Sequence, residues 1–148
     1  MKEQDLQNSQ IIRENLNELL GDMSAVEFCV LLFQISQLFD DIYDDGVSKD
    51  ECLELIMKTM VYLPSNNFYR TFQSQLQPLI TSMFLQWMSA NKIETQGIEG
   101  ELEKSYMLRA FIYQIFHFCA ILLNRDIDGE LFQKMYGEKF EEYKREFV

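Results

Sequence analysis

The residues best suited to chemistry are four aspartates, Asp40, Asp41, Asp44 and Asp45, which fall within six positions. They end an apolar stretch that we expect to be helical, just before Gly46. Like charges at i,i+4 destabilise a helix by roughly 0.2–0.5 kcal/mol per pair, and the negative end of the helix dipole repels them further. Mg²⁺ would offset these charges, because it prefers carboxylate oxygens. Asp40, Asp41 and Asp44 are therefore candidate metal ligands, and Mg²⁺ is the one cofactor implied.

A simpler interpretation makes the same aspartates the polar face of an amphipathic helix. On a helical wheel they share one half with Ser36, whereas the other half is apolar. Asp44 and Asp45 also precede a glycine, where aspartate is a common turn residue. Asp40 and Asp41 are the pair that this interpretation leaves unexplained, so both interpretations stay open.

Two charged or titratable residues interrupt the apolar stretch from Tyr106 to Leu123. Arg109 and His117 are eight residues apart, which places them on one face of a continuous helix. Arg109 would then bind a phosphate, with His117 as an acid–base group in a pocket facing the aspartates. The alternative is a buried salt bridge from Arg109 to a carboxylate, with His117 as a hydrogen-bonded core residue. No nucleophile–base arrangement or phosphate-binding loop is present, so no catalytic residue is nominated.

The spacing Asp40-Asp41-x-x-Asp44 resembles the aspartate-rich motif of isoprenoid synthases. That resemblance implies helix-borne aspartates that hold Mg²⁺ against a diphosphate. Those enzymes are much longer, and the nearest candidate for their second metal motif, residues 124–130, has a different spacing. Glu51-x-x-Glu54 is similar to one of the two metal motifs of helical NTP pyrophosphohydrolases, but the second motif is missing. A Mg²⁺-dependent enzyme acting on a diphosphate or nucleotide is therefore the alternative function.

Several segments resemble small helical proteins encoded by tailed phages and prophages. These segments are residues 40–44 (Asp-Asp-Ile-Tyr-Asp), 63–70 (Leu-Pro-Ser-Asn-Asn-Phe-Tyr-Arg), 76–78 and 87–91. The resemblance covers roughly residues 30 to 125 and implies a viral protein with an accessory or virion-associated role. It would place the protein in the host cytoplasm or the virion.

Composition and charge limit the classes of partner that the protein is expected to bind. The chain has 148 residues, of which 47% are hydrophobic, and a net charge of −11. That charge disfavours binding to nucleic acid and to anionic membrane surfaces. Cys29, Cys52 and Cys119 are dispersed, as expected for reduced thiols in a cytoplasmic compartment, and the polar N-terminus gives no sign of a signal peptide. We expect a non-enzymatic protein that acts through protein–protein contacts, with a protein partner or as a homo-oligomer.

Helix start and stop signals predict an all-α fold. The expected helices cover about residues 9–20, 24–44, 48–62, 68–75, 78–94 and 101–123, with one or two short helices after that. Capping boxes are predicted at Ser24 and Ser48, and a turn over residues 63–67, because Pro64 disfavours helical geometry at Leu63. No segment alternates as a strand would. The prediction is one domain, residues 1–148: a single compact bundle of about five to seven helices around a buried central helix at about 101–123.

The apolar residues of the central helix raise the question of whether it spans a membrane. Residues 106–123 fall short of the roughly 20 apolar residues of a spanning helix. Arg109 and His117 would both be costly in lipid. A helix that is apolar on nearly all sides is then expected to be a core helix, and no membrane contact is predicted.

Overall fold

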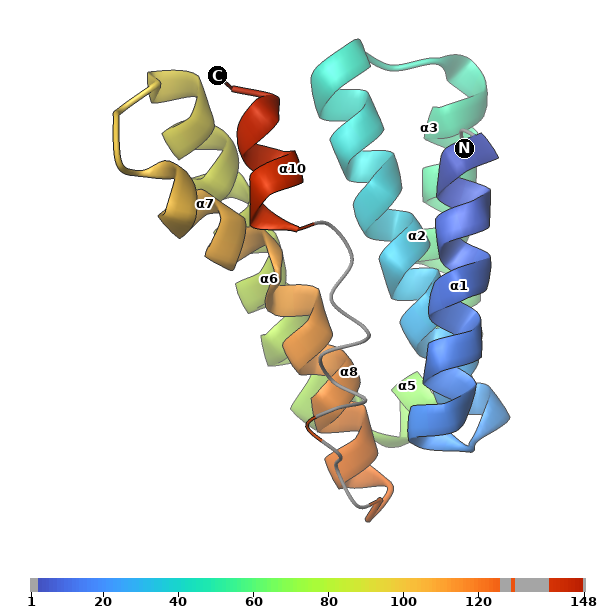
Figure 1. Ribbon diagram of the computed structural model, residues 1–148. Coiled ribbons are helices and arrows are strands. Elements are labelled where there is room, and N and C mark those ends of the chain that lie inside the picture. Colours follow the sequence, from blue (N-terminus) through green and yellow to red (C-terminus); the bar gives the residue numbers. More distant parts are fainter. Residues whose placement is uncertain (1–2, 126–128, 130–138, 148) are drawn as a thin grey trace. The chain divides into compact units, whose positions relative to one another are not determined.

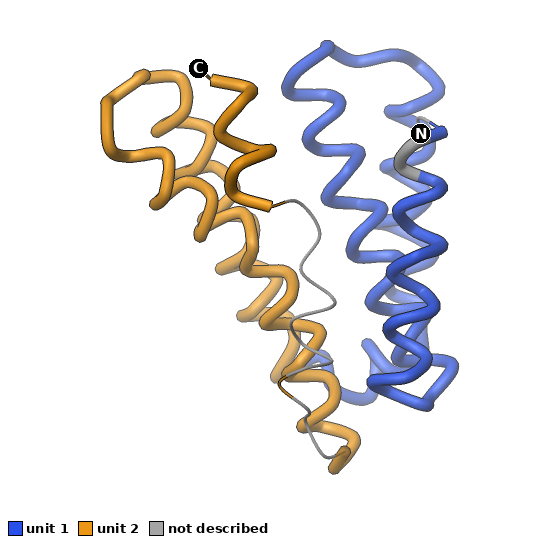
Figure 2. The backbone as a smooth tube through the Cα atoms, viewed as in Figure 1, with its two compact units in different colours: residues 1–73 blue, residues 74–148 orange. Residues whose placement is uncertain are grey.

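The computed structural model describes residues 3–125, 129 and 139–147, and these residues form helices and turns but no strand (Figure 1). The all-α class predicted from the sequence is confirmed. The chain divides into two compact units, residues 1–73 and residues 74–148 (Figure 2). Each unit holds buried apolar side chains of its own.

Unit 1 is built around α2 (Met23–Asp45). This helix contacts α1 (Glu3–Leu20), α3 (Lys49–Met57), a π-helical turn η1 (Lys58–Tyr62) and α5 (Asn67–Thr71). The part of α2 from Ala25 to Leu38 is apolar on most sides, so it must be covered on several sides. The four elements that contact α2 provide this cover. Its buried apolar residues are Ala25, Val26, Phe28, Cys29, Val30, Leu32, Phe33, Ile35 and Leu38.

Aromatic packing fixes α5 against α2. The ring of Phe28, which is fully buried, lies 5.8 Å from the ring of Phe68 and 6.0 Å from that of Tyr69, between centroids. Such pairs stabilise by about 0.5–1.5 kcal/mol beyond the area they bury. The short helix α5 is therefore held by tertiary contacts, because five residues are too few to be stable as an isolated helix.

The predicted capping box at Ser24 is wrong. The N-cap of α2 is Asp22, whose Oδ1 accepts from the Ala25 amide at 2.8 Å. Ser24 Oγ accepts instead from the Phe68 amide at 2.8 Å, and thereby caps the start of another helix. Ser48 is confirmed as the N-cap of α3, since its Oγ accepts from the Glu51 amide at 3.1 Å.

The turn predicted over residues 63–67 begins later than expected, at Asn66 (φ −72°, ψ 125°). Leu63 keeps helical geometry (φ −63°, ψ −52°), and α4 (Leu63–Ser65) follows η1 directly. A proline within an α-helix clashes with the carbonyl four residues earlier. The wider π turn, in which the Leu63 amide donates to Lys58 O, comes just before Pro64 and relieves that clash.

Two further boundaries differ from the prediction. The helix expected at 68–75 ends at Thr71, because Phe72 leaves helical geometry (φ −112°, ψ 23°). The next helix, α6 (Gln73–Gln96), then begins before Pro78, which lies inside it rather than in its first turn. Proline has no amide N–H, so Pro78 cannot donate a helical hydrogen bond to the carbonyl of Ser74, which lies close to the helix start.

Unit 2 contains α6, α7 (Leu102–Arg109), α8 (Phe111–Leu122) and α10 (Phe140–Arg145). The single helix predicted at 101–123 is wrong, because it breaks at Ala110 (φ −79°, ψ 0°). Alanine is the best helix former, so tertiary contacts rather than local propensity must impose the break. The apolar core of α8 consists of Ile112, Ile115, Phe116, Cys119 and Ala120. The short helices expected after Leu123 fall partly outside the described residues.

By length and hydropathy alone, α2 and the stretch Leu102–Leu122 could each cross a membrane. The core helix of a soluble protein passes the same test. Half of the α2 window is buried inside the protein, as expected of a core helix.

The Ser24–Phe68 hydrogen bond gives a stability prediction. Ser24→Ala leaves a part-buried amide without its acceptor, so we expect unfolding free energy to fall by about 1–2 kcal/mol. Ser89→Ala is the matched control, because Ser89 is exposed on α6 and its Oγ only back-bonds to Leu85 O. Urea unfolding of both variants measures the difference. Equal stability of the two would contradict the cap assignment.

Candidate functional site

The four aspartates occupy different environments in the structure. Asp41 is buried, with 9% of its surface exposed, and Asp40 is half-buried. Asp44 and Asp45 are exposed, and the Gly46 amide closes the helix by donating to Ile42 O at 3.0 Å. Within residues 3–125, 129 and 139–147, no three His, Cys, Asp or Glu side chains gather in a group that could hold a metal ion.

A melting experiment tests the metal hypothesis for Asp40 and Asp41. We expect the same melting temperature in EDTA and in millimolar Mg²⁺, with NaCl matching the ionic strength. An ion that binds only the folded state stabilises it by about 2.7 kcal/mol at one hundred times its Kd. A Mg²⁺-dependent rise that disappears in Asp40→Asn/Asp41→Asn would overturn this expectation.

Arg109 forms an ion pair with Glu94 in unit 2. Its Nε donates to Glu94 Oε1 at 2.6 Å, and its Nη2 donates to Glu94 Oε2 at 3.0 Å. Nη2 also donates to Asn91 Oδ1. The Glu94 side chain is only 9% exposed, so the two charges meet where little water screens them. The sequence left two roles open for Arg109, and this geometry corresponds to the buried salt bridge. The ion pair joins α7 to α6.

A second buried polar contact lies next to this ion pair. The hydroxyl groups of Ser105 and Tyr143 are hydrogen-bonded, and both residues are buried. Burial raises the pKa of Tyr143, with the hydrogen bond to Ser105 acting in the opposite direction, so the phenol stays protonated at neutral pH. The ring of Tyr143 also lies 5.4 Å from that of Tyr106, between centroids. Together these contacts attach α10 to α7.

His117 and Arg109 belong to different helices, α8 and α7, on either side of the break at Ala110. His117 Nδ1 is 3.0 Å from Tyr113 O, the carbonyl one turn earlier. Burial lowers the pKa of His117 and the hydrogen bond to Tyr113 raises it by less, so the imidazole is neutral at pH 7.

The ion pair makes a quantitative prediction. Glu94→Gln or Arg109→Met leaves one polar partner buried, and we expect a loss of about 2–4 kcal/mol of unfolding free energy. Lys104→Met is the control, because Lys104 is 62% exposed in its pair with Glu101 and such pairs contribute about 0–1 kcal/mol. Chemical denaturation measures all three variants. A loss from Glu94→Gln no larger than that from Lys104→Met would contradict the buried pairing.

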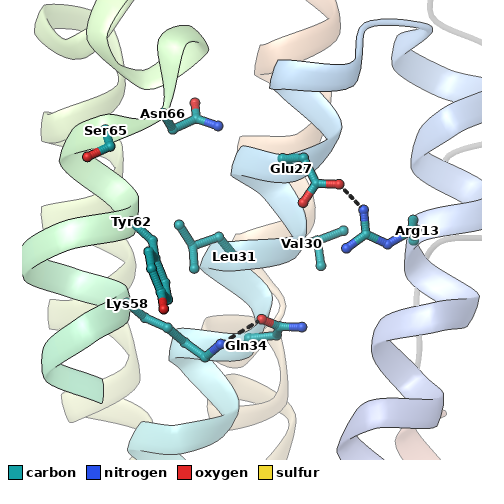
Figure 3. Close-up of a pocket in the computed structure, with 9 residues that line it drawn as sticks. All are labelled: Arg13, Glu27, Val30, Leu31, Gln34, Lys58, Tyr62, Ser65 and Asn66. Carbon is teal, nitrogen blue, oxygen red and sulfur yellow. Dashed lines mark hydrogen bonds and ion pairs between the residues drawn. The ribbon is translucent and has the colours of Figure 1, made fainter. Parts of the chain in front are cut away.

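A cavity of about 320 Å³ opens in unit 1 beside α2 (Figure 3). Val30 and Leu31 of α2 form an apolar part of its wall, and Tyr62 of η1 stands opposite Leu31. Lys58 of η1 also lines it, and its Nζ donates to Gln34 Oε1 at 3.1 Å. The cavity thus combines an apolar wall, one aromatic ring and a partly buried ammonium group.

The outer side of α3 and η1 is apolar and exposed. None of the residues of α3, η1 or α4 is fully buried. Exposed fractions reach 56% at Leu53 and 72% at Met60. We call this surface the apolar stripe; its members are Leu53, Ile56, Met57, Met60 and Val61. Contiguous exposed apolar surface of this kind is typical of interaction sites.

Comparison of the chain with protein-family models, with curated proteins and with solved structures gives no match in any of the three.

The apolar stripe and the cavity were not predicted from the sequence. A signal for the stripe does exist: residues 52–63 are apolar on almost every side, with Lys58 and Glu54 the only charges. One face of such a helix can cover α2 while another remains unused. No comparable signal exists for the cavity, because its walls come from three segments that are distant in sequence.

Proposed function

We propose that the protein is a non-enzymatic accessory protein that binds another protein through the apolar stripe. The observation that carries this proposal is the exposure of five large apolar side chains along α3 and η1. Leu53, Ile56 and Met57 of α3 follow i, i+3, i+4, the spacing with which one helix lies along another, and Met60 and Val61 follow in the π-helical turn. Two of the five are methionines, whose flexible side chains adapt to different partner surfaces.

The partner that fits this surface is a basic protein that presents an amphipathic helix. The net charge of −11 attracts a cationic partner and makes two copies of this chain repel one another. At the end of the stripe nearest Leu53, the last turn of α2 carries exposed Asp44 and Asp45, and the first turn of α3 carries exposed Asp50. Lysines or arginines at one end of the partner helix would meet these carboxylates while its apolar face covers the stripe.

The phage-type resemblance belongs to the same proposal. An accessory or virion-associated protein of a tailed phage would work in the host cytoplasm or the virion and would meet other virus-encoded proteins there. The proposal involves no direct contact with nucleic acid, which a charge of −11 disfavours, and no membrane.

A designed peptide tests the stripe. The probe is an amphipathic helix with a leucine face and lysines at one end, and we expect Leu53→Ser/Met60→Ser to weaken its binding at least about tenfold. The control is Met107→Ser/Ile121→Ser, which changes equally exposed apolar residues of unit 2 and leaves the affinity unchanged. Calorimetric titration measures all three proteins.

Stability and self-association complete that test. Leu53→Ser/Met60→Ser changes exposed side chains, so its unfolding free energy stays within about 0.5 kcal/mol of the parent. Unchanged affinity in the stripe variant contradicts the proposal. So does a dimer, seen by sedimentation velocity, that dissociates when the stripe is changed, because the occupant is then a second copy.

A further inference from the structure

The cavity in unit 1 supports a binding proposal that does not depend on the apolar stripe. Val30 is buried and Leu31 half-buried, so the inner wall is aliphatic, while the outer side of the cavity is open to solvent. Tyr62 faces Leu31 from η1 (Figure 3). A volume of about 320 Å³ is near the lower end of the range for small-molecule sites. An apolar group of modest size fits between the ring and the aliphatic wall.

Lys58 brings a positive charge to this apolar wall. Its side chain is 14% exposed. The Nζ donates to the neutral Oε1 of Gln34 at 3.1 Å and lies 3.6 Å from the carboxylate of Glu54. An ammonium group carries three N–H donors, so Lys58 retains a donor for an incoming anion. A hydrogen bond between two charged groups is stronger where water is restricted.

The charges around the cavity limit the ligand to one negative charge. Glu27 lines the opposite side, where it would repel an anion, but its carboxylate is paired with Arg13 (Figure 3). The Arg13–Glu27 pair and the Lys58–Glu54 pair are each neutral as a whole, so the cavity offers an ammonium donor rather than a net positive charge. A second negative charge on the ligand would have no further cation of its own and would lie among Glu27 and Glu54.

We propose that the cavity binds a small apolar monocarboxylate. The carboxylate accepts a hydrogen bond from Lys58 Nζ, and the apolar part lies between Leu31 and Tyr62. A free organic acid and the C-terminal residue of a peptide both present this chemistry, and the choice of probe separates them.

The test is a ¹H–¹⁵N NMR titration with phenylacetate and with its neutral isostere, phenylacetamide. Phenylacetate shifts the side-chain amide of Gln34 and the backbone amides of Lys58–Tyr62, with a Kd on the order of 1 mM, as expected for about ten non-hydrogen atoms. Phenylacetamide binds at least about tenfold more weakly. No perturbation up to about 20 mM phenylacetate, or equal binding of the two probes, overturns the proposal.

Variants assign the effect to the cavity. Lys58→Gln removes the charge and weakens phenylacetate binding at least about tenfold, whereas Lys49→Gln, an exposed lysine of α3 outside the cavity, leaves it unchanged. Leu31→Phe fills the cavity and excludes both probes. Binding that survives Lys58→Gln contradicts the proposal; if that variant does not fold, the probe pair on the parent protein still decides.

The probe acetyl-glycyl-phenylalanine identifies the source of the ligand. Tighter binding of this dipeptide than of phenylacetate, lost when its C-terminus is amidated, assigns the cavity to a chain terminus. Tighter binding of phenylacetate assigns it to a free organic acid. Both outcomes require Lys58, and neither depends on Leu53 or Met60, so failure of the stripe proposal leaves this one intact.

Discussion

The organisation of unit 1 depends on one constraint: from Ala25 to Leu38, α2 is apolar on most sides, and this part has to be covered. Buried side chains at almost consecutive positions, from Ala25 to Ile35, show how complete that cover is. Four elements supply it, namely α1, α3, η1 and α5. Because α3 and η1 carry more apolar side chains than the cover of α2 uses, five of these side chains face outward as the apolar stripe. The candidate docking surface is thus a consequence of how α2 is buried.

Unit 2 is held by a different kind of interaction. Its α8 buries apolar residues as a core helix does, but α7 is joined to α6 by polar groups, and to α10 by a hydrogen bond together with the ring contact of Tyr106 and Tyr143. The Arg109–Glu94 ion pair and the Ser105–Tyr143 hydrogen bond are both shielded from water. Buried polar contacts add little net stability, but breaking one is costly, so they favour one arrangement of helices over others.

The sequence predicted those features that depend on local chemistry. Apolar periodicity and turn residues located most helices and the all-α class, and Ser48 was recognised as a cap because its partner is three residues away. Two of the errors have tertiary causes. Ser24 caps a helix 44 positions further along, and the break at Ala110 lies beside an ion pair from Arg109 to α6. The helical geometry at Leu63 has a local cause instead, the π turn before Pro64. Arg109 was singled out as a lone cation among apolar residues, but its partner Glu94 could not be chosen from the sequence.

The docking proposal requires that the apolar stripe lies in solvent in the free protein. Methionine oxidation measures this exposure directly. Dilute hydrogen peroxide converts exposed methionines to sulfoxides, and mass spectrometry gives the rate at each position. The structure predicts fast oxidation of Met60, which is 72% exposed, and slower oxidation of the half-buried Met83. Oxidation of Met60 as slow as that of Met83 would show that the stripe is covered in the free protein, and would contradict its assignment as an open docking surface.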